Sequence, residues 1–188
     1  MSKIFAATAA LVAAAGAASA AELLVVDLSV ANQVTISATT GASAINSSAS
    51  AINGVYMQNF YSVAGPGLIY SNGVGNLTSV GAASDGTPGL FRGANDAGLN
   101  IWSLSASAMN FTAGQQAFTG SATWTVSAAE YAALIADGGR TGNIFANADT
   151  ADDLPANGII GTYRAVVPTP GAAALLGLAG VAGLRRRR

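Results

Sequence analysis

The densest group of side chains that could bind a metal is an acidic cluster in the last quarter of the chain. Asp149, Asp152 and Asp153 place three carboxylates close together in the sequence. Hard cations such as calcium prefer several oxygen ligands of this kind. The spacing does not match the Asp-x-Asp-x-Asp-Gly loop of an EF-hand. The alternative is a solvated loop in which Asp149 or Thr150 caps a short turn before Pro155, and these three aspartates remain the calcium candidates.

The residue types that are missing limit the chemistry further. The chain has no histidine and no cysteine, and its single lysine is Lys3. Ser-His-Asp and Cys-His catalysis are therefore excluded, together with ordinary zinc sites. Two carboxylates could still hydrolyse a glycosidic bond, but no motif pairs two acids. We predict no catalytic or cofactor-binding residue, and a carboxylate-based glycosidase is the enzymatic alternative.

Aromatic side chains raise the question of sugar binding. The candidates for stacking on a glycan are Trp102, Trp124, Tyr56, Tyr61, Tyr70 and Tyr163. In a β-sandwich such side chains more often fill the core. Trp124 alternates in phase with Ala122 and Val126, which predicts a core position. A carbohydrate-binding module is therefore an alternative function.

Alternating polar and apolar residues predict the strands that must position these groups. Val34 and Ile36 alternate with Gln33, Thr35 and Ser37, a half-buried strand pattern. Strands are expected over residues 23–30, 33–38, 55–63, 99–106, 117–126 and 159–167. Asn-Gly and Asp-Gly pairs separate several of them and favour sharp turns. The stretch 65–98, rich in Gly and Asn, is expected to form hairpins and loops rather than packed core.

One helix is expected among the strands. Ser127-Ala128-Ala129-Glu130 has the form of a capping box, in which the serine hydroxyl and the glutamate each bind a backbone amide. Tyr131, Leu134 and Ile135 then share one helical face. These signals predict a short helix over about residues 128–137. Many strands and one helix predict an all-β domain, either a β-sandwich or a jelly roll.

The charges are distributed unevenly along the chain. Residues 21–166 hold three arginines and all nine carboxylates, a formal net charge of −6, whereas the whole chain has −1. An acidic domain lacks the basic surface that nucleic-acid binding requires. We therefore expect no nucleic-acid partner.

The N-terminus has the three parts of a secretory signal peptide. Lys3 supplies the positive start, residues 4–18 the apolar centre, and Ala18-Ser19-Ala20 the small-residue cleavage site. We expect residues 1–20 to be removed and the mature chain to begin at Ala21. The absence of cysteine agrees with export, because a free thiol is exposed to oxidation outside the cell.

The C-terminus, residues 167–188, reads as a second targeting segment. Val167-Pro168-Thr169-Pro170 leads into an apolar run, Gly171–Leu184, of 14 residues. A bilayer core needs about 20 residues, so the run is short for a span. It is followed by Arg185, Arg186, Arg187 and Arg188. Arginine is costly to move through hydrocarbon, so these residues should stay on the cytoplasmic side. The alternative is that this run forms a buried C-terminal helix of a soluble domain.

This motif, anchor and arginine cluster resemble the PEP-CTERM sorting signal. The resemblance covers about 22 of the 188 residues. Thr169 stands where that signal usually has glutamate. The resemblance implies processing by an exosortase, a membrane-embedded enzyme similar to cysteine transpeptidases. It also implies a bacterium with two membranes and an exopolysaccharide matrix.

The sequence therefore predicts three segments: a signal peptide (1–20), a β-rich extracytoplasmic domain (21–166) and a sorting signal (167–188). The expected function is that of an exported, non-enzymatic protein of the cell envelope or extracellular matrix. It would be anchored transiently in the inner membrane before reaching the cell surface. The expected partners are the export translocon, the exosortase-type enzyme and an extracellular polysaccharide.

Overall fold

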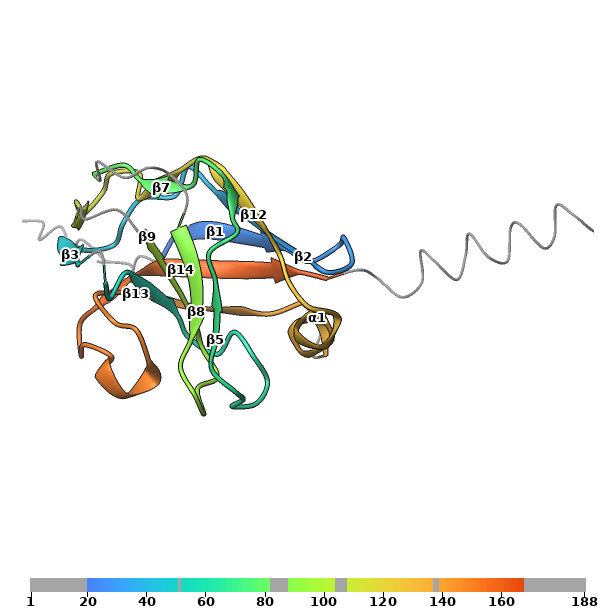
Figure 1. Ribbon diagram of the computed structural model, residues 1–188. Coiled ribbons are helices and arrows are strands. Elements are labelled where there is room, and N and C mark those ends of the chain that lie inside the picture. Colours follow the sequence, from blue (N-terminus) through green and yellow to red (C-terminus); the bar gives the residue numbers. More distant parts are fainter. Residues whose placement is uncertain (1–19, 51, 82–87, 104–107, 137–138, 168–188) are drawn as a thin grey trace, which may run out of the picture.

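Ten strands form one large curled sheet in the computed structural model of the protein (Figure 1). The structure describes residues 20–50, 52–81, 88–103, 108–136 and 139–167. The strands of the large sheet are β1 (Glu22–Asp27), β2 (Gln33–Ala38), β4 (Val55–Met57), β5 (Leu68–Tyr70), β6 (Val74–Gly75), β8 (Pro88–Arg92), β9 (Leu99–Ser103), β12 (Ser121–Thr125), β13 (Thr141–Ala146) and β14 (Ile159–Val166). The predicted all-β class is confirmed.

Two small sheets and two helical segments complete the described part of the chain. β3 (Ser47–Ala49) pairs with β10 (Met109–Phe111), and β7 (Thr78–Ser79) pairs with β11 (Phe118–Thr119). The helical segments are the α-helix α1 (Ala128–Ile135) and the 3-10 turn η1 (Ala151–Asp153).

The strand order explains why the large sheet curls. It runs β5-β8-β9-β4-β13-β14-β1-β2-β12-β6, so β5 and β6 are its two edges. These edge strands are consecutive in the sequence, and only residues 71–73 join them. The short link brings the two edges of the sheet toward each other. All the neighbouring pairs are antiparallel except β1 and β14, which are parallel.

The curl encloses the core. The inward residues of β2 and β12 are Val34, Ile36, Ala122 and Trp124, all of which are buried. Trp124 is completely inaccessible to solvent, so the prediction of a core position is confirmed. Outward residues between them alternate as the sequence pattern predicted.

Two expectations about strands need correction. The stretch 65–98 was expected to form hairpins and loops rather than packed core. It contains the strands β5, β6, β7 and β8, but Leu77 and Leu90 are buried in the core. β8 forms an antiparallel hairpin with β9 and also pairs with β5, and Leu90 of β8 packs in the core. β13 was not expected at all, because Ile144, Phe145 and Ala146 are buried in succession and break the alternation.

The predicted helix forms with a different cap. It begins at Ala128 and ends at Ile135, two residues before the expected end. The Ser127 hydroxyl accepts a hydrogen bond from the Glu130 amide at 3.2 Å, as predicted. The Ser127 amide donates instead to the Tyr70 hydroxyl at 3.3 Å, so β5 replaces the glutamate as the second half of the box. The Tyr131 hydroxyl donates to the Leu28 carbonyl and attaches the helix to the turn after β1.

Replacing Ser127 with alanine tests the cap. Ser127→Ala is expected to lower the free energy of unfolding by about 1 kcal/mol, because the Glu130 amide loses its acceptor. Ser71→Ala, a change at an exposed position beside β5, is the matched control and should stay within about 0.5 kcal/mol of the parent. Urea denaturation measures both. Equal stabilities would contradict a capping role.

Candidate functional site

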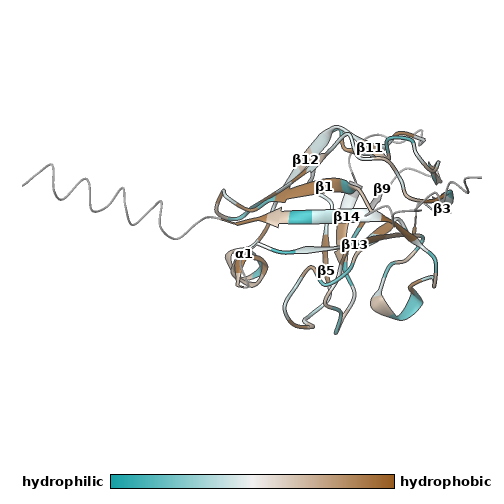
Figure 2. Ribbon diagram, turned by 180° about the vertical axis from the view of Figure 1, so that it is seen from behind, coloured by the Kyte–Doolittle hydropathy of each residue, from teal (hydrophilic) through white to brown (hydrophobic). Residues whose placement is uncertain are grey.

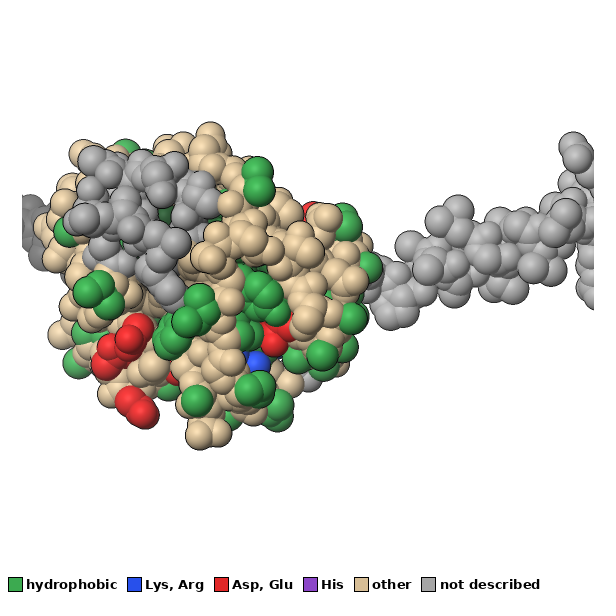
Figure 3. Space-filling model, viewed as in Figure 1, with side chains coloured by type: hydrophobic (Ala, Val, Ile, Leu, Met, Phe, Trp, Pro, Cys, Tyr) green, Lys and Arg blue, Asp and Glu red, His purple; other side chains and the backbone are tan. Residues whose placement is uncertain are grey.

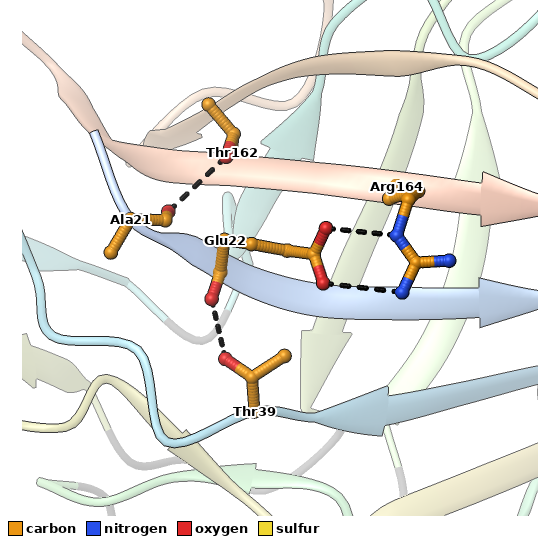
Figure 4. Close-up of polar contacts among 5 residues, drawn as sticks. All are labelled: Ala21, Glu22, Thr39, Thr162 and Arg164. Atoms are coloured by element: carbon orange, nitrogen blue, oxygen red, sulfur yellow. Dashed lines mark hydrogen bonds and ion pairs between the residues drawn. The ribbon is translucent and has the colours of Figure 1, made fainter. Parts of the chain in front are cut away.

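The two ends of the domain meet where β1 and β14 lie side by side. Glu22 and Arg164 are 142 residues apart in the chain, yet the Glu22 carboxylate accepts hydrogen bonds from Arg164 Nε at 3.0 Å and Nη2 at 3.4 Å (Figure 4). The side chains are 37% and 45% exposed. An exposed pair of this kind contributes about 0–1 kcal/mol. It therefore helps to set the register of the two strands and adds little to stability.

Backbone contacts at the same place hold the first residues after the predicted signal peptide. The Ala21 carbonyl accepts from the Thr162 amide at 2.9 Å and from its hydroxyl at 3.2 Å (Figure 4). The Glu22 carbonyl accepts from the Thr39 hydroxyl. Gly161 permits this approach, since a Cβ there would lie 2.3 Å from Leu23 Cγ. The chain is thus fixed in the sheet from Ala21 onward.

At the other end of β14 the chain leaves the domain toward the predicted sorting signal. The Val166 carbonyl accepts from the Leu28 amide at 2.8 Å. Val167, the first residue of the motif, is half-buried and packs against the core. Pro168, Thr169, Pro170, Gly171, the rest of the anchor and Arg185–Arg188 lie outside the described residues, as does Ala18.

None of the helices in the described part of the chain is long and apolar enough to cross a bilayer.

A second group of polar side chains is buried around the turn between β8 and β9. Asp96 is only 5% exposed. Its carboxylate accepts hydrogen bonds from the Tyr56 hydroxyl at 2.5 Å, the Gly98 amide at 2.6 Å and the Ala151 amide at 2.8 Å. Three donors compensate a buried anion for its lost hydration. Asp96 thereby joins β4, its own turn and η1.

Arg92 is the buried cation of this group, with 3% of its surface exposed. Its Nε donates to the Asp96 carbonyl at 2.9 Å and its Nη2 to the Val63 carbonyl at 2.7 Å. The guanidinium carbon lies 3.7 Å from the centre of the Tyr61 ring, a cation–π contact. Gly65 lies so close that a Cβ there would be 2.5 Å from Nη2. These contacts hold the cation in place without leaving it free to react.

The buried tyrosines are poor candidates for acid–base chemistry. Burial raises the pKa of Tyr56, and the hydrogen bond to Asp96 raises it further. Burial and the neighbouring Glu130 raise the pKa of Tyr61, and burial raises that of Tyr163. All three phenols therefore stay protonated at neutral pH. They act as donors and packing groups and not as phenolate bases.

Asn100 connects the outer side of the sheet to the loop over residues 147–158. It is completely buried, and its Nδ2 donates to the Asn53 carbonyl at 2.6 Å and the Ala148 carbonyl at 2.8 Å. Its Oδ1 is buried without a hydrogen-bond partner. Tyr56, Phe145 and Ala148 form a small apolar cluster at the same place. The loop is thus anchored by both polar and apolar contacts.

The calcium candidates lie on this loop. The Asp153 carboxylate accepts from the amides of Asp149 and Thr150, at 3.3 and 3.1 Å, and caps η1. Asp152 is exposed. In the ranges the structure describes, no three or more acidic side chains are grouped so that they could hold a metal ion. The geometry matches the alternative of a capped turn before Pro155, and calcium binding stays a prediction without geometric support.

Asp149 itself has an unusual environment. Burial raises the pKa of its carboxyl group above the ordinary value of 3.8, and the hydrogen bond and charge of Asp153 raise it further. The charge of Asp96 adds to the effect. Figure 3 shows acidic side chains gathered at the lower left, over the loop that contains η1 in Figure 1. Repulsion between carboxylates is therefore concentrated on this loop.

The aromatic candidates for sugar stacking mostly belong to the core. Tyr56, Tyr61, Trp124 and Tyr163 are buried. Tyr70 is half-buried and bonded to the helix cap. Trp102 belongs to β9, but its side chain is outside the described part. The aromatic side chains that are described therefore form no exposed stacking surface.

Sequence reasoning missed Arg92, Asp96 and Asn100. A weak signal for Arg92 exists, because it is one of three arginines in the domain and lies between Phe91 and Gly93 in an apolar stretch. The Asn95-Asp96 pair is a weak signal for a turn, and Asn95 does adopt the left-handed conformation, with a φ of 63°. The partners of these residues come from distant elements and leave no local pattern.

Comparison with known proteins adds no relative. No protein-family model matches the chain, and no similar curated protein or solved structure was found. The function has to be argued from the chain's own residues.

Removing the charge of Asp96 tests the buried network. Asp96→Asn should lower the free energy of unfolding by about 2–4 kcal/mol, because an amide has one acceptor oxygen and sets its own donors against Tyr56 or a backbone amide. Asp152→Asn, at an exposed position of the same loop, should change it by less than about 0.5 kcal/mol. Thermal and urea unfolding of both variants measure the difference. An Asp96→Asn protein as stable as the parent would contradict a stabilising role for the hydrogen-bond network of Asp96.

The raised pKa of Asp149 predicts how the stability of the protein changes with pH. The folded chain holds this proton more tightly than the unfolded chain. The contribution of Asp149 to stability is therefore complete below pH 3.8 and is lost as the pH rises through the raised pKa. Asp149→Asn should flatten this decline and make the protein at least as stable as the parent at pH 7. Unfolding measured from pH 3 to 7 tests the sign, with Asp152→Asn as control. A steeper decline in Asp149→Asn would contradict the assignment.

Proposed function

We propose that the protein is an exported, non-enzymatic protein of the cell envelope or exopolysaccharide matrix, sorted through a C-terminal exosortase-type signal. One observation carries the proposal. The fold occupies the residues between the two predicted targeting segments, since β1 begins at Glu22, just after Ala20, and β14 ends at Val166, just before the motif. All the strands of the large sheet lie between these two segments, so we propose that both segments serve the transport machinery.

The proposed route has three steps. Cleavage after Ala20 frees the N-terminus, the four arginines arrest the tail in the inner membrane, and cutting between Val167 and Gly171 releases the domain. The contacts of Ala21 with β14 support the first step, because they attach the expected first residue of the mature chain to the sheet. The packing of the half-buried Val167 against the core supports a third step in which the cut lies close to the folded domain.

A binding or structural role agrees with how the ionisable groups are used. Arg92, Asp96 and Asp153 are all engaged in hydrogen bonds that hold turns and strands together. We also propose that the domain is a jelly-roll-like or sandwich-like shell. The supporting features are the curled sheet and the core inside it.

Terminal peptide mapping of protein taken from the cell surface tests the route. Peptides should begin at Ala21 and end between Val167 and Gly171. Replacing Arg185–Arg188 with alanine should abolish arrest, so the chain should collect outside the inner membrane with its tail uncut. Arg164→Ala, which removes an exposed arginine from the domain, is the control and should be processed normally. A surface form that retains residues 171–188 would contradict release and indicate a permanent anchor.

A further inference from the structure

The outer face of β2 and β12 carries three consecutive cross-strand pairs of uncharged polar residues. The pairs are Gln33 with Thr125, Thr35 with Thr123, and Ser37 with Ser121. We call these six residues the hydroxyl face. All of them are at least partly accessible, and Ser121 and Thr125 are exposed. The residues between them point into the core, so the six side chains share one side of the sheet.

The hydroxyl face is ordered before any partner arrives. The hydroxyls of Thr35 and Thr123 are hydrogen-bonded to each other at 2.8 Å. Threonine is stiff about χ1 because it is branched at Cβ. Neighbouring strands are about 4.8 Å apart and alternate residues about 6.8 Å, so the polar groups form a regular grid. Side chains already fixed in this way lose little entropy when they bind.

The charges around the face select the chemistry of a partner. Solvent-facing sheet surfaces usually mix lysine with acidic residues, whereas none of these six residues is charged. On the neighbouring β1, Asp27 lies beside Thr35 and Val25 beside Ser37. Farther out, Glu22 and Arg164 neutralise each other. The order across the sheet is β12, β2, β1, β14 and β13, and the labels of β12, β1, β14 and β13 follow this order in Figure 2. The acidic loop of η1 connects β13 to β14 and also bonds to Asp96.

We infer that the hydroxyl face binds an uncharged polysaccharide in an extended conformation. Each hydroxyl is both a donor and an acceptor, and the glutamine amide offers both, which matches the hydroxyls of a sugar chain. An anionic partner would gain nothing from a face without cations. A second copy of this acidic chain, with its net charge of −6 over residues 21–166, would be repelled. The inference rests on the proposed function, because it names the matrix component that the domain contacts.

Sedimentation with insoluble glucans tests this inference. The full chain in mild detergent should be retained by curdlan or microcrystalline cellulose and not by alginate beads. Thr35→Val/Thr123→Val should reduce retention about tenfold or more, because two hydroxyls are lost. Replacing both partners with valine keeps shape and strand preference, so the melting temperature should hold. Ser121→Lys, which places a charge on the exposed part of the face, should reduce retention similarly.

Thr112→Val/Thr119→Val is the matched control, since both threonines are exposed outside the hydroxyl face. It should bind as the parent does. Equal retention of the parent and Thr35→Val/Thr123→Val would overturn the inference. Retention by alginate alone, by none of the matrices, or through self-association seen in ultracentrifugation would also overturn it. Peptide mapping at the cell surface does not depend on these results, so the sorting proposal can survive their failure.

Discussion

The parallel pairing of β1 with β14 is the constraint on which the rest of the architecture depends. It joins the first and last strands of the domain at the middle of the large sheet, with β2 continuing on one side and β13 on the other. The sheet cannot be completed until residues 159–166 have arrived. Contacts between such distant residues form slowly, because a long loop must close first. For a chain exported from its N-terminus, folding would finish only as the predicted anchor reached the membrane.

A second constraint comes from the polar groups that are buried around the turn between β8 and β9. Asp96, Arg92 and Asn100 bond mainly to backbone groups of turns and loops. Each of these contacts takes the place of a protein–water hydrogen bond that was lost on burial. Together these hydrogen bonds attach the β8–β9 turn and the η1 loop to the sheet. The apolar core alone would not order this turn and loop. The acidic loop is therefore a structural part of the domain and also the place where its negative charge gathers.

Local sequence patterns predicted the strands with a clear polar–apolar alternation and the start of the helix. The alternation in residues 33–38 and 121–126 identified β2, β12 and the burial of Trp124, and Ser127 identified the start of α1. β13 was missed because its three consecutive buried residues break the alternation, and its neighbours β14 and β4 come from other parts of the chain. The buried network was missed because its hydrogen-bond partners also come from distant elements. The targeting segments carry strong composition signals, but such signals give a destination and not the binding chemistry of the domain.

The way the chain leaves the sheet has a mechanical consequence. β14 is bonded along both sides, to β1 and to β13, and in the sequence it directly precedes the predicted sorting segment. Tension on an anchored molecule would therefore act along the strand. The hydrogen bonds of both ladders would then be loaded in shear and would have to fail together, whereas a terminal edge strand could peel away one bond at a time. Resistance to such pulling is governed by the rate of unfolding rather than by its equilibrium. The predicted anchor would therefore pull on a strand that is paired on both sides until the proposed cut releases the domain.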